Sequence, residues 1–425
     1  MNAGAAEVDI TPDFEVELSG FALRTQPATG VLDPVFVRCI YLDDGSGGRL
    51  LWMVADVLAL EPALVASFRA WAGRELALQP EQVMLAATHT HNAPGVIALT
   101  AAGRRSERYV QLLRERMERA ASDAVAAVRP CEVVAASGTL DLGIDRRDQP
   151  TKHVDPTVWS LGFREPGGGP FIAAILNYAM HPVSLGPTER RISPDWCGGA
   201  SASLAHAVAT QDGSKPIAIV TNGACGNVNP PFHGASREQV FAWGKSVADA
   251  VAESLASATP LAEPELIVRS ISIPMPLDRL DAATIDAQAD RMVNEVAPKT
   301  VWPEPFIRAV NNWHETLKSL VARGGGGFHD IELQAVRIAG VTILAANGEI
   351  FSRFTDDLRR ATGEANLFVV GYANNAFGYI PTREAYAEGG YEVDTAHFFY
   401  NSFRPAPGSL EMLCDNAARL VRSMR

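Results

Sequence analysis

Two kinds of hydrophobic pattern alternate along most of the chain. Short continuous apolar runs, such as Val83–Ala87 and Phe171–Tyr178, predict buried strands. Between them, apolar residues recur every three to four positions over longer stretches, such as 107–128, and predict amphipathic helices. This alternation favours an α/β layered domain over an all-β fold or a helix bundle.

The predicted strands are 50–57, 83–87, 132–142, 157–163, 171–178, 217–221, 265–274, 331–337, 341–346 and 367–371. The predicted helices are 62–77, 107–128, 201–210, 237–256, 282–295, 305–323, a helix that starts near Glu349, and 410–424. We therefore expect layered mixed sheets flanked by helices, in a single domain that covers residues 1–425.

Composition narrows the classes of partner. The 425 residues are 47% hydrophobic and 20% charged, as in soluble globular proteins. The formal net charge of -12 argues against nucleic acid as a partner, because its phosphates would be repelled. No apolar run approaches the roughly 18 to 20 residues of a membrane span, so we expect no transmembrane segment.

The N-terminus and the cysteines bear on the compartment. The first residues show neither the basic region nor the apolar core of a signal peptide. The five cysteines are odd in number, widely spaced and without a CxxC pair, so a disulfide framework and a Cys-rich zinc site are not expected. The cytoplasm is the simplest location that these features predict.

The most informative motif is Thr88-His89-Thr90-His91, directly after the predicted strand 83–87. If strand alternation continues through it, His89 and His91 point the same way. Two adjacent imidazoles can offer their nitrogen lone pairs to one divalent metal. The alternative is a pair of histidines that satisfy each other in a polar loop, and the motif alone leaves both readings open.

Two further segments place metal-binding residue types at strand ends. His181 follows the strand 171–178, and Pro182 ends that strand because it cannot donate to a sheet. The carboxylate of Asp195 is a candidate to orient an imidazole. Glu349 follows the strand 341–346 and is a plausible hard ligand beside imidazoles. A capped core histidine and a helix N-terminal glutamate are the structural alternatives.

Two loops carry other candidate chemistry. Segment 221–231 is rich in Gly, Asn and Pro, as an oxyanion hole or an ordinary turn-rich loop would be. Its Cys225 has small, uncharged neighbours, which disfavour a nucleophilic thiolate. Five aromatic residues fall between positions 372 and 391, and they should line a cleft or fill the core.

Taken together, these segments resemble the catalytic N-terminal domain of the neutral, zinc-dependent ceramidases. The family's Thr-His-Thr-His and Pro-Gly pattern is matched by Thr88 to Gly95, and its strand ending in His by Asn177 to His181. Its Gly-Glu pair and its tyrosine-rich segment are matched by Gly348-Glu349, residues 378–386 and Tyr391-Glu392. Order and spacing fit over nearly the whole chain.

The resemblance implies a Zn²⁺ site and several residues around it. The implied zinc ligands are His89, His181, Glu349 and Tyr379. The resemblance also implies that His91 contacts the metal-bound water, that Arg146 lies near the substrate, and that Tyr391 donates to the developing oxyanion.

The sequence departs from the family pattern at Asn229, which stands where the family has a proposed catalytic serine. An amide can donate to an oxyanion but cannot be acylated, so we expect attack by zinc-bound water. The ceramidases continue into a C-terminal β-sandwich, and we expect this fold to lack that domain.

These observations predict a zinc-dependent hydrolase that cleaves a linear amide (N-acyl) bond in a small-molecule or lipid-like substrate. A zinc esterase or lactonase that uses the same site is the alternative within enzymes, because both substrates pass through the same kind of oxyanion. A catalytically silent ligand-binding protein is the alternative outside enzymes. It predicts a replaced metal position, and all four positions are intact.

Overall fold

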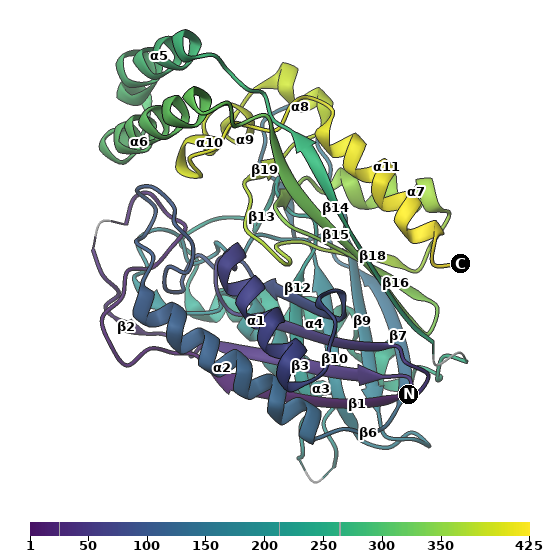
Figure 1. Ribbon diagram of the computed structural model, residues 1–425. Coiled ribbons are helices and arrows are strands. Elements are labelled where there is room, and N and C mark those ends of the chain that lie inside the picture. The colour runs from purple at the N-terminus through teal and green to yellow at the C-terminus, as the bar shows by residue number, and fades with distance from the viewer. Residues whose placement is uncertain (25, 212, 263–264) are drawn as a thin grey trace.

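Three large β-sheets form the centre of the protein (Figure 1), in a computed structural model that describes residues 1–24, 26–211, 213–262 and 265–425. The first sheet, in the order β5-β4-β3-β1-β6, contains β1 (Asn2–Asp9), β3 (Phe36–Asp43), β4 (Arg49–Ala55), β5 (Val83–Ala87) and β6 (Arg129–Pro130). The second, in the order β12-β10-β9-β7, contains β7 (Glu132–Thr139), β9 (Thr157–Arg164), β10 (Phe171–Tyr178) and β12 (Ile217–Asn222). The third, in the order β14-β15-β16-β18, contains β14 (Leu266–Pro276), β15 (Phe328–Ile338), β16 (Val341–Ala346) and β18 (Leu367–Val370).

Each large sheet is mainly antiparallel and has one parallel pair at an edge. These pairs are β4 with β5, β10 with β12, and β16 with β18. Three short ladders lie beyond the sheets: β2 (Gly30–Val31) with β11 (Arg191–Ile192), β8 (Ile144–Asp145) with β13 (Val228–Asn229), and β17 (Glu349–Ile350) with β19 (Tyr379–Ile380).

Helices cover the outer face of every large sheet. The first sheet packs against α1 (Pro62–Glu75) and α2 (Glu107–Ala126), the second against α3 (Trp196–Ala207) and α4 (Arg237–Ser257), and the third against α7 (Arg353–Thr362) and α11 (Ser409–Arg422). The inner faces share one apolar core, in which Trp52, Leu161 and Ile343 are contributed by different sheets. This arrangement confirms the predicted layered mixed α/β fold (Figure 1).

A helical excursion separates β14 from β15 and lies at one end of the molecule (Figure 1). It contains α5 (Ala282–Arg291), short π and 3₁₀ turns over 292–299, and α6 (Pro303–Ala322). Phe306 and Trp313 of α6 pack against Phe398 in α10 (Ala396–Phe399). The remaining short helices are the 3₁₀ turn Pro80–Gln82, α8 (Arg383–Glu388) and α9 (Tyr391–Asp394).

Two predicted helix starts are wrong. Glu349 does not begin a helix: it pairs with Tyr379 in β17/β19 and its N–H donates to the carbonyl of Gly378 at 3.0 Å, so α7 begins only at Arg353. Helix α3 begins at Trp196 rather than at 201, because the Asp195 side chain accepts a hydrogen bond from the Trp196 N–H and caps the helix.

The cysteines and the helices bear on two further expectations, the lack of a disulfide framework and the lack of a transmembrane segment. Cys39, Cys131, Cys197, Cys225 and Cys414 are all free and buried, as the sequence predicts. Within the described part of the chain, none of the helices combines the length and apolarity that a membrane crossing requires.

Candidate metal centre

Three strand ends bring metal-binding side chains together. His89 lies two residues beyond β5, His181 three beyond β10, and Glu349 three beyond β16. Each of these strands belongs to a parallel edge pair, and the sheets share a core, so their carboxyl ends lead to one place. All three side chains are buried.

The donor atoms of these residues and His91 are close to one another. Nε2 of His181 is 2.9 Å from Oε2 of Glu349, and Nε2 of His89 is 3.4 Å from the same oxygen. Nε2 of His91 is 3.3 Å from Nε2 of His89. The donor atoms of His89, His91 and His181 all lie within 4.8 Å of one another, so these three could hold a metal ion.

Hydrogen bonds at Nδ1 of His89 and His181 determine which ring nitrogen of each carries the proton. Nδ1 of His89 lies 2.7 Å from the carbonyl of Leu58, and Nδ1 of His181 lies 2.7 Å from the carbonyl of Cys225. A carbonyl can only accept, so each Nδ1 carries the proton and each Nε2 presents its lone pair to the centre. This is the tautomer that a divalent metal needs.

Asp195 does not orient an imidazole, contrary to the sequence-based expectation. Its carboxylate accepts from the N–H groups of Trp196 at 2.7 Å and Leu185 at 3.1 Å. The carboxylate is committed to the start of α3, and backbone carbonyls orient the histidines instead.

The electrostatic setting keeps the imidazoles of His91 and His181 neutral and the Glu349 carboxylate charged. Burial lowers the pKa of His181 to about 4. Burial, reinforced by His89 and His181, lowers the pKa of His91 well below its usual range. Burial alone would raise the pKa of Glu349, but the close approach of His181 and His89 outweighs burial and holds that pKa well below the usual range. These are the protonation states of metal ligands.

His89 and His91 lie close together, as expected, but strand alternation is not the cause. Strand β5 ends at Ala87, and His89 has a φ of 68°, so the strand pattern does not continue through the motif. The His89 ring stacks on Tyr372 with centroids 3.9 Å apart, and the His91 ring packs against Phe21 at 4.8 Å. Packing in a turn therefore sets the two rings.

Arg24 fixes the loop that carries this motif, and sequence reasoning missed it. Its buried guanidinium donates to the His91 carbonyl, to Oδ1 of Asn92 at 3.0 Å and to the carbonyl of Gly186 at 3.2 Å. Arg24 thus ties the histidine loop to the segment that follows His181. A lone arginine in an N-terminal loop gives no sequence signal for this role.

Two tyrosines flank Glu349. Tyr379 is its direct partner in β17/β19, and the Arg146 guanidinium carbon lies over the Tyr379 ring, 5.3 Å from the ring centroid. Burial raises the pKa of Tyr379 well above its usual range, and Arg146 opposes that shift. The hydroxyl of Tyr400 donates to Oε1 of Glu349 at 2.5 Å. Sequence reasoning missed Tyr400, although the aromatic run Phe398–Tyr400 marks the place.

Arg146 and Asn229 are neighbours because β8 pairs with β13. Nη1 of Arg146 donates to Oδ1 of Asn229 at 3.3 Å, and Nε donates to Oε1 of the buried Glu392 at 2.7 Å. Nδ2 of Asn229 is 3.1 Å from Nε2 of His233, whose Nδ1 donates to the carbonyl of Val183 at 3.0 Å. His233 and Glu392 complete a network that the sequence did not indicate as a unit.

Two loop features remain from the sequence: the Cys225 thiol and the aromatic residues between positions 372 and 391. The Cys225 thiol is buried 3.1 Å from the Tyr372 hydroxyl, and burial raises the pKa of the thiol, which is the wrong direction for a thiolate nucleophile. The aromatic residues between 372 and 391 divide between the two predicted roles. Tyr379 and Tyr391 line the cavity at the centre, whereas Phe377 and Tyr386 pack in the core under the third sheet.

A cavity of about 280 Å³ opens over the metal centre. Its lining includes His89, His91, Glu349 and Tyr400, together with Arg146, Asn229, His233, Tyr379 and Tyr391. Apolar side chains, among them Phe21, Leu23, Leu99, Trp302 and Phe399, make up much of the rest. The arrangement juxtaposes a metal-binding set, polar hydrogen-bonding groups and apolar side chains, as hydrolysis of an acyl compound requires.

Comparisons with known proteins agree in sequence and in fold. The family profile described as neutral/alkaline non-lysosomal ceramidase, N-terminal, matches residues 1–264. Neutral ceramidase of Pseudomonas aeruginosa is 27% identical over 248 residues, which cover 53% of this chain and 36% of that protein. The match thus spans about a third of the relative's length.

Solved structures extend the likeness to the whole chain. A crystal structure of neutral ceramidase from Pseudomonas aeruginosa has a TM-score of 0.74 at 19% identity, over 100% of this chain and 74% of that one. A structure described as ceramidase complexed with C2 has a TM-score of 0.77 at 19% identity, over 100% and 75% of the two chains. At this identity the structural match establishes the shared fold.

Proposed function

Because the chain belongs to the neutral/alkaline non-lysosomal ceramidase family, we propose that it is a zinc-dependent hydrolase of linear N-acyl amides. The observation that carries the proposal is the buried convergence of His89, His181 and Glu349, with both imidazole Nε2 atoms turned toward one carboxylate oxygen. Three neutral or anionic donors of these types are a typical catalytic zinc set.

We assign zinc binding to His89, His181, Glu349 and Tyr379. Oε2 of Glu349 lies close to both His89 and His181, and Tyr379 is paired with Glu349 in the ladder. The donor nitrogen of His91 also lies within 4.8 Å of those of His89 and His181, but His91 lacks the direct contact with Glu349 that both of them make among the described residues. We therefore assign His91 to proton handling beside the metal rather than to the ligand set.

Bound zinc would supply a Lewis acid and lower the pKa of a water molecule to about 7. His91 would take a proton from the attacking water and deliver it to the leaving amine, which is general acid–base catalysis. Its partly buried ring is neutral at physiological pH, so a ring nitrogen has a lone pair free for the proton of the attacking water.

The carbonyl oxygen becomes negatively charged during attack, and donors in the cavity would hold it. Arg146, Asn229 and Tyr391 line the same cavity as His91 and carry N–H or O–H groups. The amide of Asn229 cannot form an acyl intermediate, so the chain's own residues support direct attack by water.

The apolar part of the cavity lining suits the acyl part of a small-molecule or lipid-like amide. An ester or lactone would pass through the same oxyanion and is the second candidate. A silent ligand-binding protein is less favoured, because the four zinc positions carry metal-binding residue types and three of them are already oriented.

The test is a matched pair of amide and ester substrates with the same acyl group, assayed with zinc-loaded wild type and with His89→Ala. We expect wild type to hydrolyse the amide, and His89→Ala to lose both bound zinc and turnover. Hydrolysis of the ester alone would favour the esterase alternative. Zinc binding without turnover of either substrate would favour the silent alternative.

A further inference from the structure

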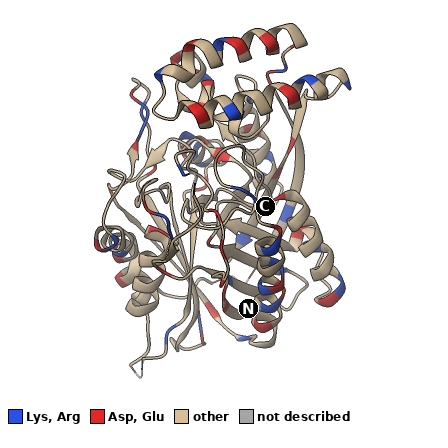
Figure 2. Cartoon of the chain, turned by 90° about the vertical axis from the view of Figure 1, so that its left-hand side faces the viewer, with Lys and Arg blue, Asp and Glu red and all other residues tan. Residues whose placement is uncertain are grey.

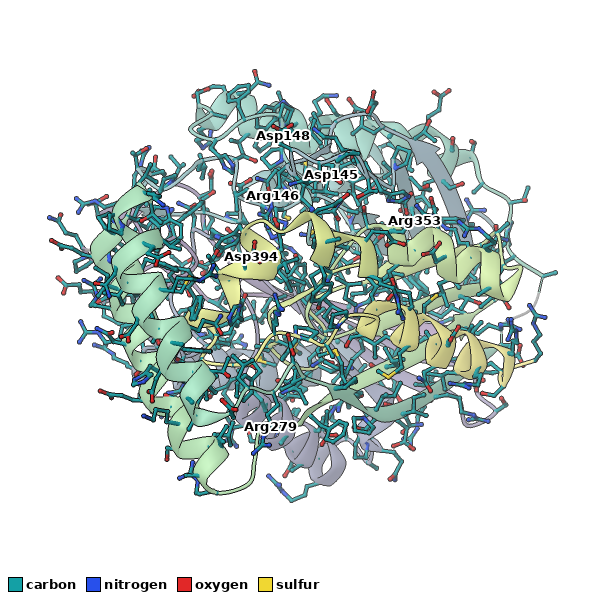
Figure 3. All side chains as sticks on the ribbon, turned by 90° about the horizontal axis from the view of Figure 1, so that it is seen from above. Asp145, Arg146, Asp148, Arg279, Arg353 and Asp394 are labelled. Carbon is teal, nitrogen blue, oxygen red and sulfur yellow. The ribbon has the colours of Figure 1, made fainter. Side chains whose placement is uncertain are left out.

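A second cavity, of about 470 Å³, adjoins the cavity over the metal centre. The two share Arg146, Asn229, His233 and Tyr391. Beyond these, the second cavity is lined by Arg147, Asp148, Gln149, Gly389, Gly390 and Glu392. Figure 3 labels Arg146 and Asp148, which come from the same segment after β8. We refer to this second cavity as the polar cavity.

The polar cavity differs sharply in chemistry from its neighbour. None of its lining residues has an aliphatic side chain, whereas the first cavity is lined in part by Phe, Leu and Trp. A linear amide has two arms that leave the scissile bond in opposite directions. One cavity therefore matches an apolar arm and the other a polar arm, with Arg146 and Asn229 at the junction.

The charges of the polar cavity balance. Glu392 accepts from Nε of Arg146 at 2.7 Å and from Nη1 of Arg147 at 2.9 Å. Arg147 also donates to Glu388 at 3.3 Å, and Asp148 adds an exposed carboxylate. The residues that line the cavity thus carry two positive charges, on Arg146 and Arg147, and two negative charges, on Asp148 and Glu392, whereas Glu388 lies outside the lining. The lining itself therefore has no excess charge to attract an anion or a cation. Figure 2 likewise shows both signs of charge interspersed along the chain.

Hydrogen-bonding capacity nevertheless remains in the polar cavity. Gln149 donates through Nε2 to the Glu388 carbonyl at 3.2 Å, and its Oε1 has no partner among the described residues. Asn229 uses one of its two Nδ2 hydrogens toward His233. The Asp148 carboxylate can accept, and the Tyr391 hydroxyl can donate or accept. Apart from the Asp148 carboxylate these groups are uncharged, and donors and acceptors that are interspersed in this way match hydroxyl groups.

We propose that the polar cavity binds the amine part of the substrate, and that this part is an uncharged, hydroxyl-rich group such as an amino sugar or amino polyol in amide linkage. The acyl chain occupies the apolar cavity. With about 280 Å³, that cavity is just below the roughly 300–1,000 Å³ of small-molecule sites, so it suits short acyl chains. This assignment rests on the proposed amide hydrolysis and specifies its substrate class.

The experiment compares two butyryl amides, N-butyrylglucosamine and N-butyrylhexylamine, with the zinc-loaded protein. We expect kcat/KM to be at least about tenfold higher for the glucosamine amide, since one well-made set of hydrogen bonds is worth about 1.4 kcal/mol or more. Gln149→Ala should lower that selectivity ratio at least about fivefold, mainly through KM for the glucosamine amide. Gln111→Ala, an exposed glutamine on α2, is the matched control and should keep the wild-type ratio.

Asp148→Asn repeats the test at an exposed position where misfolding is not expected. The deciding quantity is kcat/KM for the glucosamine amide divided by kcat/KM for the hexylamine amide. A value at or below one for wild type, or a value unchanged in both Gln149→Ala and Asp148→Asn, would overturn the assignment of the polar cavity and leave amide hydrolysis standing. Failure of the zinc-loaded protein to cleave any amide would overturn the proposed function, and this assignment with it.

Discussion

Nδ2 of Asn229 lies 3.1 Å from Nε2 of His233. Because His233 donates through Nδ1 to the Val183 carbonyl, its Nε2 is an acceptor, and it therefore fixes the Asn229 amide with nitrogen toward the histidine and oxygen toward Arg146. The side chain of Asn229 is thus held in one orientation. His233 acts as a positioning residue for Asn229.

This relationship predicts different effects for two His233 variants. His233→Leu removes the acceptor and should lower kcat/KM on a soluble amide about tenfold, because a misaligned oxyanion donor weakens transition-state binding. His233→Gln keeps an acceptor and should stay within about threefold of wild type. Bound zinc, measured in parallel, should be equal in all three proteins. Equal activity of the Leu and Gln variants would contradict the positioning role.

Tyr400 should tune metal affinity through Glu349. Tyr400→Phe removes the hydrogen bond to Oε1 of Glu349 and should weaken zinc binding about 10- to 100-fold, as loss of a group that orients a ligand does. Competition with a chelating dye measures the change. Tyr386→Phe is the matched control, since its hydroxyl donates to the Pro405 carbonyl at 2.7 Å away from the centre and its loss should leave zinc affinity unchanged. Equal affinity in both variants would argue against Glu349 as a ligand.

Gly20 makes room for His91. A Cβ at Gly20 would lie 2.4 Å from Nδ1 of His91, and its φ of +107° already disfavours a side chain. Gly20→Ala should displace the ring and reduce turnover at least about tenfold, since His91 is the assigned proton carrier. Gly167→Ala, with a φ of +77° and open space, has a similar backbone cost without the clash and should keep wild-type turnover. Normal turnover in Gly20→Ala would remove His91 from the mechanism.

The sequence predicted most of the fold because apolar periodicity reports burial directly. It identified β5 and β10 at their observed boundaries and placed His89 and His181 near strand ends. It failed at Glu349, where the two-residue ladder with Tyr379 is formed by positions 30 residues apart and has no periodic signature. Such pairing depends on tertiary contact rather than on local propensity.

The contrast between local sequence patterns and tertiary contacts also explains which site residues could be predicted from the sequence. The strand-end motif indicated His89 and His91, and Arg146 was indicated only by the resemblance to the family. Tyr400 and His233 reach the centre from segments without such a pattern, through contacts with Glu349 and Asn229. Single hydrogen bonds between distant segments leave no trace in one sequence.

His397 should make stability depend on pH. Burial, with help from Arg404, lowers its pKa to about 3, below the usual value of about 6.5 in an unfolded chain. As pH falls from 6.5, the unfolded chain therefore takes up a proton that the folded protein does not, and the free energy of unfolding falls, by about 2 kcal/mol between pH 6.5 and 4.5. Well above pH 6.5 this contribution is constant.

Chemical denaturation of wild type and His397→Phe at several pH values measures this effect. Phenylalanine keeps the ring packing against Trp313 and Phe398 and cannot titrate, so the acid-dependent loss should shrink by that amount. His206→Gln, at an exposed position on α3, should behave as wild type. If the free energy of unfolding had the same pH dependence in wild type and in His397→Phe, the lowered pKa of His397 would not be its cause.

The central claim is that a metal held by His89, His181, Glu349 and Tyr379 is required for amide hydrolysis. The most direct measurement titrates metal-free protein with Zn²⁺ and records bound zinc and amide turnover in the same samples. We expect no turnover without metal, turnover that rises in proportion to bound zinc until a single site is filled, and neither binding nor turnover in His89→Ala. Full turnover by the metal-free protein would contradict the account.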